Sequence, residues 1–232
     1  MFEADNRVKI YLAHVIYESG KINDAADIIR QLVEAKYVLQ PEDRMLVINV
    51  WLSIVNPHRS AILNMKDIPK PCDNIHIAIE EMTEILNKNL DEIINIIQTH
   101  ILSQSMEEEG KALFLRYLAD FQRYKLDCVD PAEIAKIGSE SRSNYMKAID
   151  FFKTQPNQNV EILMSSYLNY SILLADYLDQ KLKALDLITQ QHHELSMSLE
   201  KYPPDTRAKV QDIVDLMAEN IERWKPKQEV DL

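Results

Sequence analysis

The scarcity of glycine restricts the fold of this chain more than any other feature. Only 3 glycines occur among its 232 residues, and none follows an asparagine or an aspartate, so the dipeptides typical of tight β-hairpins are missing. Apolar residues instead recur at the spacing of an α-helix along most of the sequence. The longest such stripe comprises Ile75, Ile79, Met82, Leu86, Leu90, Ile93, Ile97 and Ile101. Together these features predict an all-α protein.

Prolines and short polar segments divide the helical pattern into nine segments, which we expect to form an antiparallel array. Pro41 and Pro131 suit the first turns of the third and sixth helices. Pro57 is expected to kink or interrupt the third helix, because proline removes a backbone donor and clashes with the preceding turn. We expect one helical domain over residues 1–225 and a short polar tail over 226–232. The predicted helices span about residues 4–19, 22–37, 41–66, 74–102, 106–125, 130–153, 159–178, 180–200 and 206–224.

Charge and composition argue against several classes of function. The formal net charge of −11 disfavours nucleic acid and anionic membranes as partners. No apolar run is long enough for membrane insertion. Cys72 and Cys128 are far apart and lack metal-ligand spacing, which indicates a reducing compartment, and we expect a cytoplasmic protein. No glycine-rich phosphate loop or nucleophile motif occurs, so we expect neither an enzyme nor a cofactor or metal.

One arginine interrupts an apolar helix near the middle of the chain. Arg116 follows Leu113 and Leu115, and Tyr117 comes directly after it. A cation on a largely apolar helix wall is costly unless a partner compensates its charge. The partner could be a carboxylate in the core or a planar anion from outside the protein. The sequence pattern alone leaves both possibilities open.

Four segments carry a resemblance to a known family. The Arg-Tyr-Leu-Ala-Asp of residues 116–120 resembles the Arg-Tyr-Leu-Ala-Glu of the 14-3-3 family, and the Leu-Asn-Tyr-Ser-Ile of residues 168–172 is similar to that family's Leu-Asn-Phe-Ser-Val. Residues 213–224 resemble its C-terminal helix, which ends in a tryptophan, and residues 39–46 resemble its Leu-Ser-x-Glu-Glu-Arg-Asn-Leu. Because the motifs occur in the family's order, the chain is identified as a divergent member.

The resemblance implies a cup of nine helices, usually dimeric, with one amphipathic groove in each subunit. Members of the family are adaptors in signal transduction that bind phosphoserine or phosphothreonine segments of client proteins. By the resemblance, Arg59, Arg116 and Tyr117 would bind the phosphate, and Asn169 and Asn220 would hold the peptide backbone. Asp176 takes the place of the family's groove glutamate. The implied groove wall comprises Leu168, Ile172, Asp176, Ile213, Leu216 and Trp224.

The resemblance also implies a homodimer. Two oppositely charged residues on the second helix would face a lysine and a glutamate on the fourth helix of the partner, with apolar packing alongside. An alignment shifted by three residues would put Ile85 and Asn89 in place of Lys88 and Glu92. Exposed ion pairs add little stability, so dimer strength would rest on the apolar contacts. The implied interface residues are Val15, Ile16, Lys21, Asp24, Lys88 and Glu92.

Two departures from the family pattern concern the phosphate site. Leu52 stands where the family has a phosphate-contacting lysine, and Pro57 lies just before Arg59. Losing one charge-assisted hydrogen bond predicts an affinity for ordinary phosphopeptides lower by at least about tenfold. A second hypothesis is therefore a helical-repeat scaffold that binds unphosphorylated protein segments, with Arg59 and Arg116 pointing apart. A helical enzyme is the third, and it lacks any acid–base or metal constellation.

Overall fold

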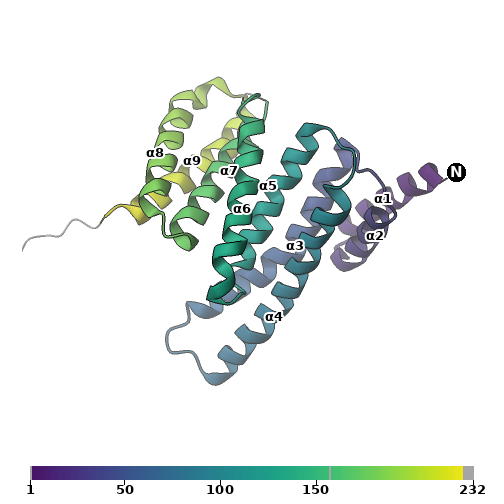
Figure 1. Ribbon diagram of the computed structural model, residues 1–232, viewed down its shortest axis with the longest axis horizontal. Coiled ribbons are helices and arrows are strands. Elements are labelled where there is room, and N and C mark those ends of the chain that lie inside the picture. Colours follow the sequence, from purple (N-terminus) through teal and green to yellow (C-terminus); the bar gives the residue numbers. More distant parts are fainter. Residues whose placement is uncertain (1, 157, 227–232) are drawn as a thin grey trace, which may run out of the picture. The chain divides into compact units, whose positions relative to one another are not determined.

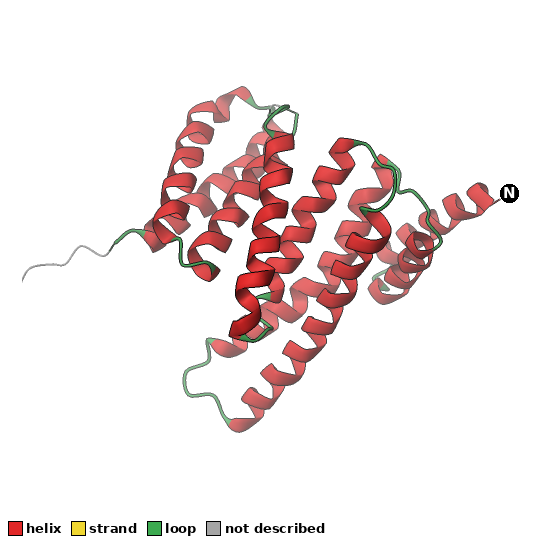
Figure 2. Cartoon of the chain, viewed as in Figure 1, coloured by secondary structure: helices red, strands yellow, loops and turns green. Residues whose placement is uncertain are grey.

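The structure, a computed structural model, describes residues 2–156 and 158–226. This part of the chain contains nine α-helices and no β-strand (Figure 2), which confirms the predicted all-α class. Residues 227–232, most of the predicted tail, lie outside the described residues. The α-helices are α1 (Phe2–Glu18), α2 (Ile22–Glu34), α3 (Pro41–Lys66), α4 (Asp73–Ile96), α5 (Glu108–Lys125), α6 (Pro131–Phe152), α7 (Val160–Ile172), α8 (Lys181–Ser198) and α9 (Pro204–Trp224).

The helices form two compact units, Met1–Asp130 and Pro131–Leu232. In the first unit, α1 packs against α2, while α4 packs against both α3 and α5 (Figure 1). Each of these helices turns one apolar face inward, so burial of side chains from several helices holds the unit together. The prediction of a single domain over residues 1–225 stays a prediction. The fully buried large side chains of the first unit include Ile29, Leu32, Ile48, Leu86, Leu90, Phe114 and Phe121.

A turn at Gly20 joins α1 to α2. Gly20 has a φ of +82°, a left-handed conformation in which a side chain would be strained. The N–H of Gly20 donates to the carbonyl of Tyr17 at 2.9 Å, and that of Lys21 donates to Ile16 at 3.2 Å. This pair of bonds is a Schellman motif, which satisfies carbonyls at the end of a helix.

The third helix runs without interruption from Pro41 to Lys66, so of the two expected effects of Pro57 the interruption is wrong, whereas the kink stays a prediction. Val55 and Ile62 are buried on either side of Pro57, and this packing keeps both halves of α3 on the same core. The proline still removes the N–H that would bond the carbonyl of Ser53. One position along, the ring nitrogen Nδ1 of His58 lies 2.8 Å from the carbonyl oxygen of Ile54.

The second unit is built around α7. This helix packs against α6, α8 and α9, and α8 also packs against α9 (Figure 1). One core cluster joins Val160 of α7, Leu195 of α8 and Val214 of α9. The rings of Tyr145 and Tyr170 add a second contact, with their centroids 6.1 Å apart.

Two of the predicted helices end in a π-helical turn. The predicted helix over residues 74–102 consists of α4 followed by a π turn, η1 (Ile97–Ile101). The predicted helix over 159–178 consists of α7 followed by a second π turn, η2 (Leu173–Tyr177). Such turns widen a helix by one residue and change the direction of the side chains that follow. Asp176, one of the implied groove residues, lies within η2.

Candidate functional site

Arg116 has an internal carboxylate partner. Its Nη1 lies 2.9 Å from Oδ2 of Asp120, one helical turn further along α5. Asp120 is 1% exposed and Arg116 is 9% exposed, so this pair lies at the edge of the core. The Arg116 guanidinium also lies over the ring of Tyr117, 4.1 Å from its centroid. These two contacts fix the plane of the guanidinium, which carries five N–H donors in total.

Arg59 contacts a different tyrosine. Its guanidinium lies 3.6 Å from the ring centroid of Tyr124, and its Nη2 lies 3.9 Å from Oδ2 of Asp127. Tyr124 is seven residues beyond Tyr117, or about 10 Å along the axis of α5. The structure therefore places Arg59 in the same unit as Arg116, with its guanidinium stacked on a tyrosine two turns further along.

A third arginine joins these two, and the sequence analysis missed it. Arg123 is 6% exposed, its Nη2 lies 3.7 Å from Oδ1 of Asp120, and its guanidinium lies 4.7 Å from the Tyr124 ring centroid. The Arg123-Tyr124 pair repeats Arg116-Tyr117 after seven residues. This heptad spacing puts both pairs on one face of α5. The repeat is visible in the sequence and could have identified Arg123 in advance. We call Arg59, Arg116, Tyr117, Asp120, Arg123 and Tyr124 the arginine–tyrosine cluster.

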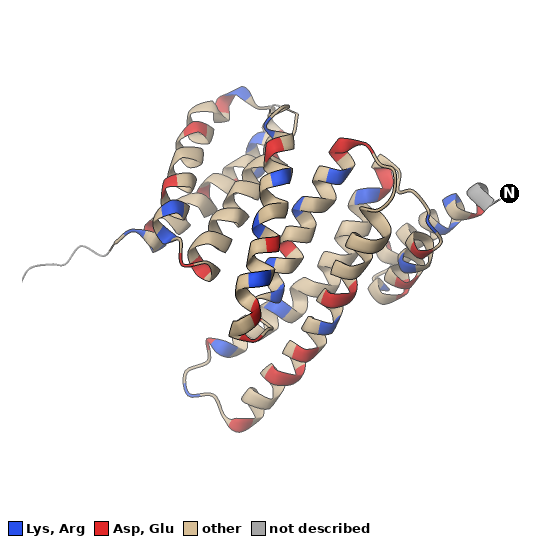
Figure 3. Cartoon of the chain, viewed as in Figure 1, with Lys and Arg blue, Asp and Glu red and all other residues tan. Residues whose placement is uncertain are grey.

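Both phenols of the cluster are held in the protonated form. Burial raises the pKa of Tyr117, against a smaller opposing effect of Arg116. Burial also raises the pKa of Tyr124, together with the charge of Asp120 and against the three arginines. Each tyrosine hydroxyl is therefore a hydrogen-bond donor at neutral pH. Although acidic and basic residues alternate over most helices (Figure 3), this cluster combines three arginines with one buried carboxylate.

The position of the family's lysine lies on an uncharged surface. Leu52 is partly exposed and lines a shallow groove between α1 and α3 together with Asn49, Asn56 and Ser60. Tyr17 closes one side of this groove, and its hydroxyl lies 3.2 Å from the hydroxyl of Ser53. Within the described part of the chain, no charged side chain lines the groove.

The remaining implied groove residues lie in the second unit, on α7, η2 and α9. Asn169 and Asn220 are both partly exposed, and the helices that carry them pack against each other. Among the wall residues, Leu216 is 47% exposed, whereas Leu168 is buried. Ile172 and Ile213 are partly exposed.

Asp176 contacts Trp224 directly, and it also contacts Arg223, a residue that the sequence analysis did not single out. Nη2 of Arg223 donates to Oδ2 of Asp176 at 2.8 Å. The indole Nε1 of Trp224 donates to Oδ1 of the same carboxylate at 3.2 Å. Trp224 is 3% exposed, so its ring is mainly a packing element. Only the position of Arg223 next to Trp224 could have drawn attention to it.

The residues implied for dimerisation lie on exposed parts of the first unit. Val15 is 47% exposed, and it continues an apolar face of α1 with Val8, Tyr11 and Leu12. Ile16 is partly buried, whereas Lys21, Asp24 and Lys88 are exposed. These four apolar residues form one face because their spacing along the chain follows the period of the helix.

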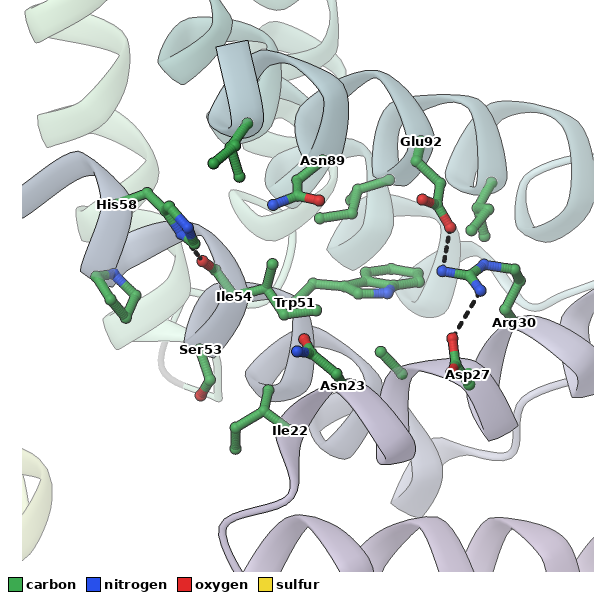
Figure 4. Close-up of a pocket in the computed structure, with 15 residues that line it drawn as sticks. Ile22, Asn23, Asp27, Arg30, Trp51, Ser53, Ile54, His58, Asn89 and Glu92 are labelled. Atoms are coloured by element: carbon green, nitrogen blue, oxygen red, sulfur yellow. Dashed lines mark hydrogen bonds and ion pairs between the residues drawn. The ribbon is translucent and has the colours of Figure 1, made fainter. Parts of the chain in front are cut away.

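A cavity of about 560 Å³ lies among α2, α3 and α4 (Figure 4). Trp51 lines it, as do the two alternative interface residues Ile85 and Asn89 and the side chain of Glu92. Glu92 forms an ion pair with Arg30, which also pairs with Asp27 at 2.7 Å. The two possible alignments of α4 thus share one cavity, and its glutamate already has a partner within the chain.

Comparison with known proteins decides the family. The family model described as 14-3-3 protein matches residues 12–225. The chain belongs to the 14-3-3 family. A 14-3-3 protein homolog of Encephalitozoon cuniculi is 27% identical over 210 residues, which cover 84% of this chain and 80% of that protein. 14-3-3 protein 2 of Entamoeba histolytica is 21% identical over 228 residues, covering 93% and 94%. The four motifs of the sequence analysis therefore belong to a diverged 14-3-3 protein.

The described residues also show whether this 14-3-3 protein has a membrane-spanning helix or a cluster of metal-binding side chains. Among the residues that the structure describes, no helix combines the length and the apolar character needed to cross a membrane. In the same part of the chain, no group of three or more histidine, cysteine, aspartate or glutamate side chains could hold a metal ion. Burial raises the pKa of the Cys128 thiol to about 11, so this cysteine is a poor nucleophile.

Proposed function

We propose that this 14-3-3 protein is a non-enzymatic cytoplasmic adaptor that binds phosphoserine or phosphothreonine segments of client proteins in signal transduction. The observation that carries the proposal is the orientation of Arg116, which Asp120 and Tyr117 hold from two directions. A preorganised guanidinium loses little freedom when it binds an anion. The formal net charge of the protein is −11, yet two arginines share the buried carboxylate of Asp120 and Arg59 stacks on the neighbouring Tyr124, so this local excess of positive charge supports an anion-binding role.

The chemistry of a phosphate suits this cluster. A phosphorylated side chain carries a charge of about −1.5 to −2 and three acceptor oxygens. Guanidinium groups of Arg59 and Arg116 would donate paired hydrogen bonds to these oxygens, and the protonated hydroxyl of Tyr117 would donate another. Arg59 would leave Asp127, whose carboxylate lies 3.9 Å away, in exchange for the more highly charged phosphate.

The second unit would recognise the backbone of the bound segment. A carboxamide has both a donor and an acceptor, so Asn169 and Asn220 could pair with a peptide group as a neighbouring strand does. Such contacts read the main chain and tolerate many side chains. The exposed Leu216 and the partly exposed Ile172 and Ile213 would give the bound segment an apolar surface.

The affinity for phosphopeptides would be weaker than a site with a further cation allows. Leu52 supplies no charge, and its groove is lined by neutral side chains. Replacing Leu52 by lysine should therefore strengthen phosphopeptide binding by about tenfold, because it adds one charge-assisted hydrogen bond. Isothermal titration of one phosphopeptide with both proteins measures this change. Equal affinities would show that Leu52 does not face the bound phosphate.

We also propose that the protein is a homodimer, paired through α1 and α2 of one subunit and α4 of the other. The apolar face of α1, with Val8, Tyr11, Leu12 and Val15, supports this arrangement. Lys21 and Asp24 would extend the contact from α2, opposite Lys88 and Glu92 of the partner subunit's α4. Glu92 already forms an ion pair with Arg30 of its own chain, so the lysine from the other subunit would share its carboxylate with that arginine.

A paired titration tests the proposed function. Peptides identical except for a phosphate on one serine or threonine are titrated into the protein, and the ratio of their dissociation constants is measured. We expect the phosphorylated form to bind at least tenfold more tightly. Equal affinities, or no binding of either form, would contradict the proposal. Tight binding of the unphosphorylated form would favour the helical scaffold, which the neutral groove beside Leu52 and the stacking of Arg59 on Tyr124 support.

A further inference from the structure

The carboxylate of Asp176 is occupied from within the chain. Its Oδ2 accepts a hydrogen bond from Arg223 at 2.8 Å, and its Oδ1 accepts one from the indole of Trp224 at 3.2 Å. Both oxygens are thus engaged by residues of α9. The π turn η2 carries Asp176 at the end of α7, the helix that packs against α9.

Arg223 is held at the surface. Its side chain is 55% exposed, that of Asp176 is 33% exposed, and its guanidinium lies 5.3 Å from the ring centroid of Trp224. Arg223 follows Asn220 by three residues on α9, so the two side chains lie on neighbouring parts of one helix face. The ion pair therefore adjoins the residue that we assign to the peptide backbone.

We propose that Arg223 is an internal competitor for Asp176 and abolishes selection for a basic residue in the bound segment. This inference rests on the proposed function. An unpaired carboxylate beside the backbone-binding asparagines would attract an arginine or lysine of the ligand. Here such a residue must displace Arg223, whose charge also cancels the field of Asp176. The clients of this protein are accordingly phosphorylated segments that need no basic residue to pair with Asp176.

A peptide series with a movable arginine tests the inference. The parent peptide has one phosphoserine flanked by three alanines on each side, and an arginine replaces each alanine in turn. The native protein should bind all members within about twofold of the parent. An R223L variant should bind one or two adjacent members up to about fivefold more tightly than the parent, because an exposed ion pair with Asp176 becomes available to the ligand.

A matched variant separates this effect from a general change in charge. Lys225 lies at the same end of α9 and pairs with Glu222, so K225L removes the same charge without touching Asp176. K225L should leave the preference within twofold, whereas R223K should retain the bridge and bind as the native protein does. In R223L combined with D176N, the preference for arginine should disappear, since the asparagine has no charge to offer.

The outcomes distinguish this inference from the proposed function. If R223L binds phosphopeptides but shows no more preference for arginine than K225L, the inference is overturned and the proposed function stands. If the native protein already prefers an arginine at one position by fivefold, the inference is likewise overturned. If no phosphopeptide binds to any of these proteins, the proposed function fails and the inference fails with it.

Discussion

At the scale of single residues, the cluster on α5 depends on one carboxylate shared by two arginines. Asp120 is 1% exposed and lies 2.9 Å from Arg116 and 3.7 Å from Arg123. A buried carboxylate is stable only when cations or hydrogen bonds replace its lost hydration. Asp120 therefore compensates the charge of the two arginines and orients their guanidinium groups, which links the stability of α5 to the geometry of the site.

This coupling predicts non-additive mutations. R116Q removes the nearer cation from a buried carboxylate and should destabilise the protein by about 2 kcal/mol, less than a fully isolated charge would cost because Arg123 remains. In the double variant R116Q/D120N no carboxylate is left unpaired, so the total loss should be smaller than the sum of the single losses by at least about 1 kcal/mol. Urea unfolding of the four proteins measures the coupling. Strict additivity would show that the two side chains do not interact.

The sequence identified Arg116 as a residue whose charge needs a partner, but it did not identify the residues that surround Arg116. The interruption of an apolar helix by Arg116 and Tyr117 indicated a compensated charge, and a carboxylate in the core was one of the two partners considered. Arg59 could not be located in advance, because the position of its side chain depends on how α3 continues past Pro57. The role of Arg123 was missed because it lies outside the family motifs. The role of Arg223 was missed because, within residues 213–224, the resemblance singles out Asn220 and Trp224 and not Arg223.

At the scale of elements, periodicity and helix-ending residues located the helices well. Gly20 ends α1 and Pro41 begins α3, as their backbone preferences require. The continuity of α3 through Pro57 could not be predicted from local preference, because buried residues on both sides outweigh the lost hydrogen bond. Gly110 shows a further element-level constraint. A Cβ there would lie 2.6 Å from Sδ of Met106 and 2.8 Å from Cζ of Arg44 on α3.

Substituting Gly110 should therefore disturb the approach of α5 to α3. Arg44 is 5% exposed and its Nη2 donates to Glu107 at 2.9 Å, so it has little room to move. We expect G110A to destabilise the protein by about 2 kcal/mol despite the better helix propensity of alanine. G20A provides a contrast, because nothing lies within 4 Å of the added Cβ and only the φ of +82° is strained. Thermal unfolding compares them, and a stabilised G110A would contradict the steric argument.

At the scale of the whole molecule, the proposed dimer gives a role to the apolar face of α1. Leu12 is 46% exposed and Val15 is 47% exposed, on a helix that otherwise packs on α2. A contiguous apolar face is unusual on the surface of a monomer. We propose that pairing uses this face, whereas exposed ion pairs of Lys21, Asp24, Lys88 and Glu92 would contribute little.

Charging this face should produce a monomer. The variant L12E/V15E places two carboxylates at the centre of the proposed interface, where burying them would be strongly unfavourable. Sedimentation equilibrium should show a dimer for the native protein and a monomer of about 27 kDa for the variant. The control L182E changes a leucine that is 74% exposed on α8 and should remain dimeric. A monomeric native protein would refute the proposed interface.

The central claim is that the arginine–tyrosine cluster binds a phosphate, and one measurement tests it most directly. The affinity of a phosphopeptide and of its unphosphorylated counterpart is measured with the native protein, with R116Q/D120N and with K183Q, which removes an exposed lysine from α8. We predict a preference of at least tenfold for the phosphorylated peptide in the native protein and in K183Q, and its loss in a folded R116Q/D120N. A preference that survives in R116Q/D120N would place the phosphate elsewhere and contradict the account.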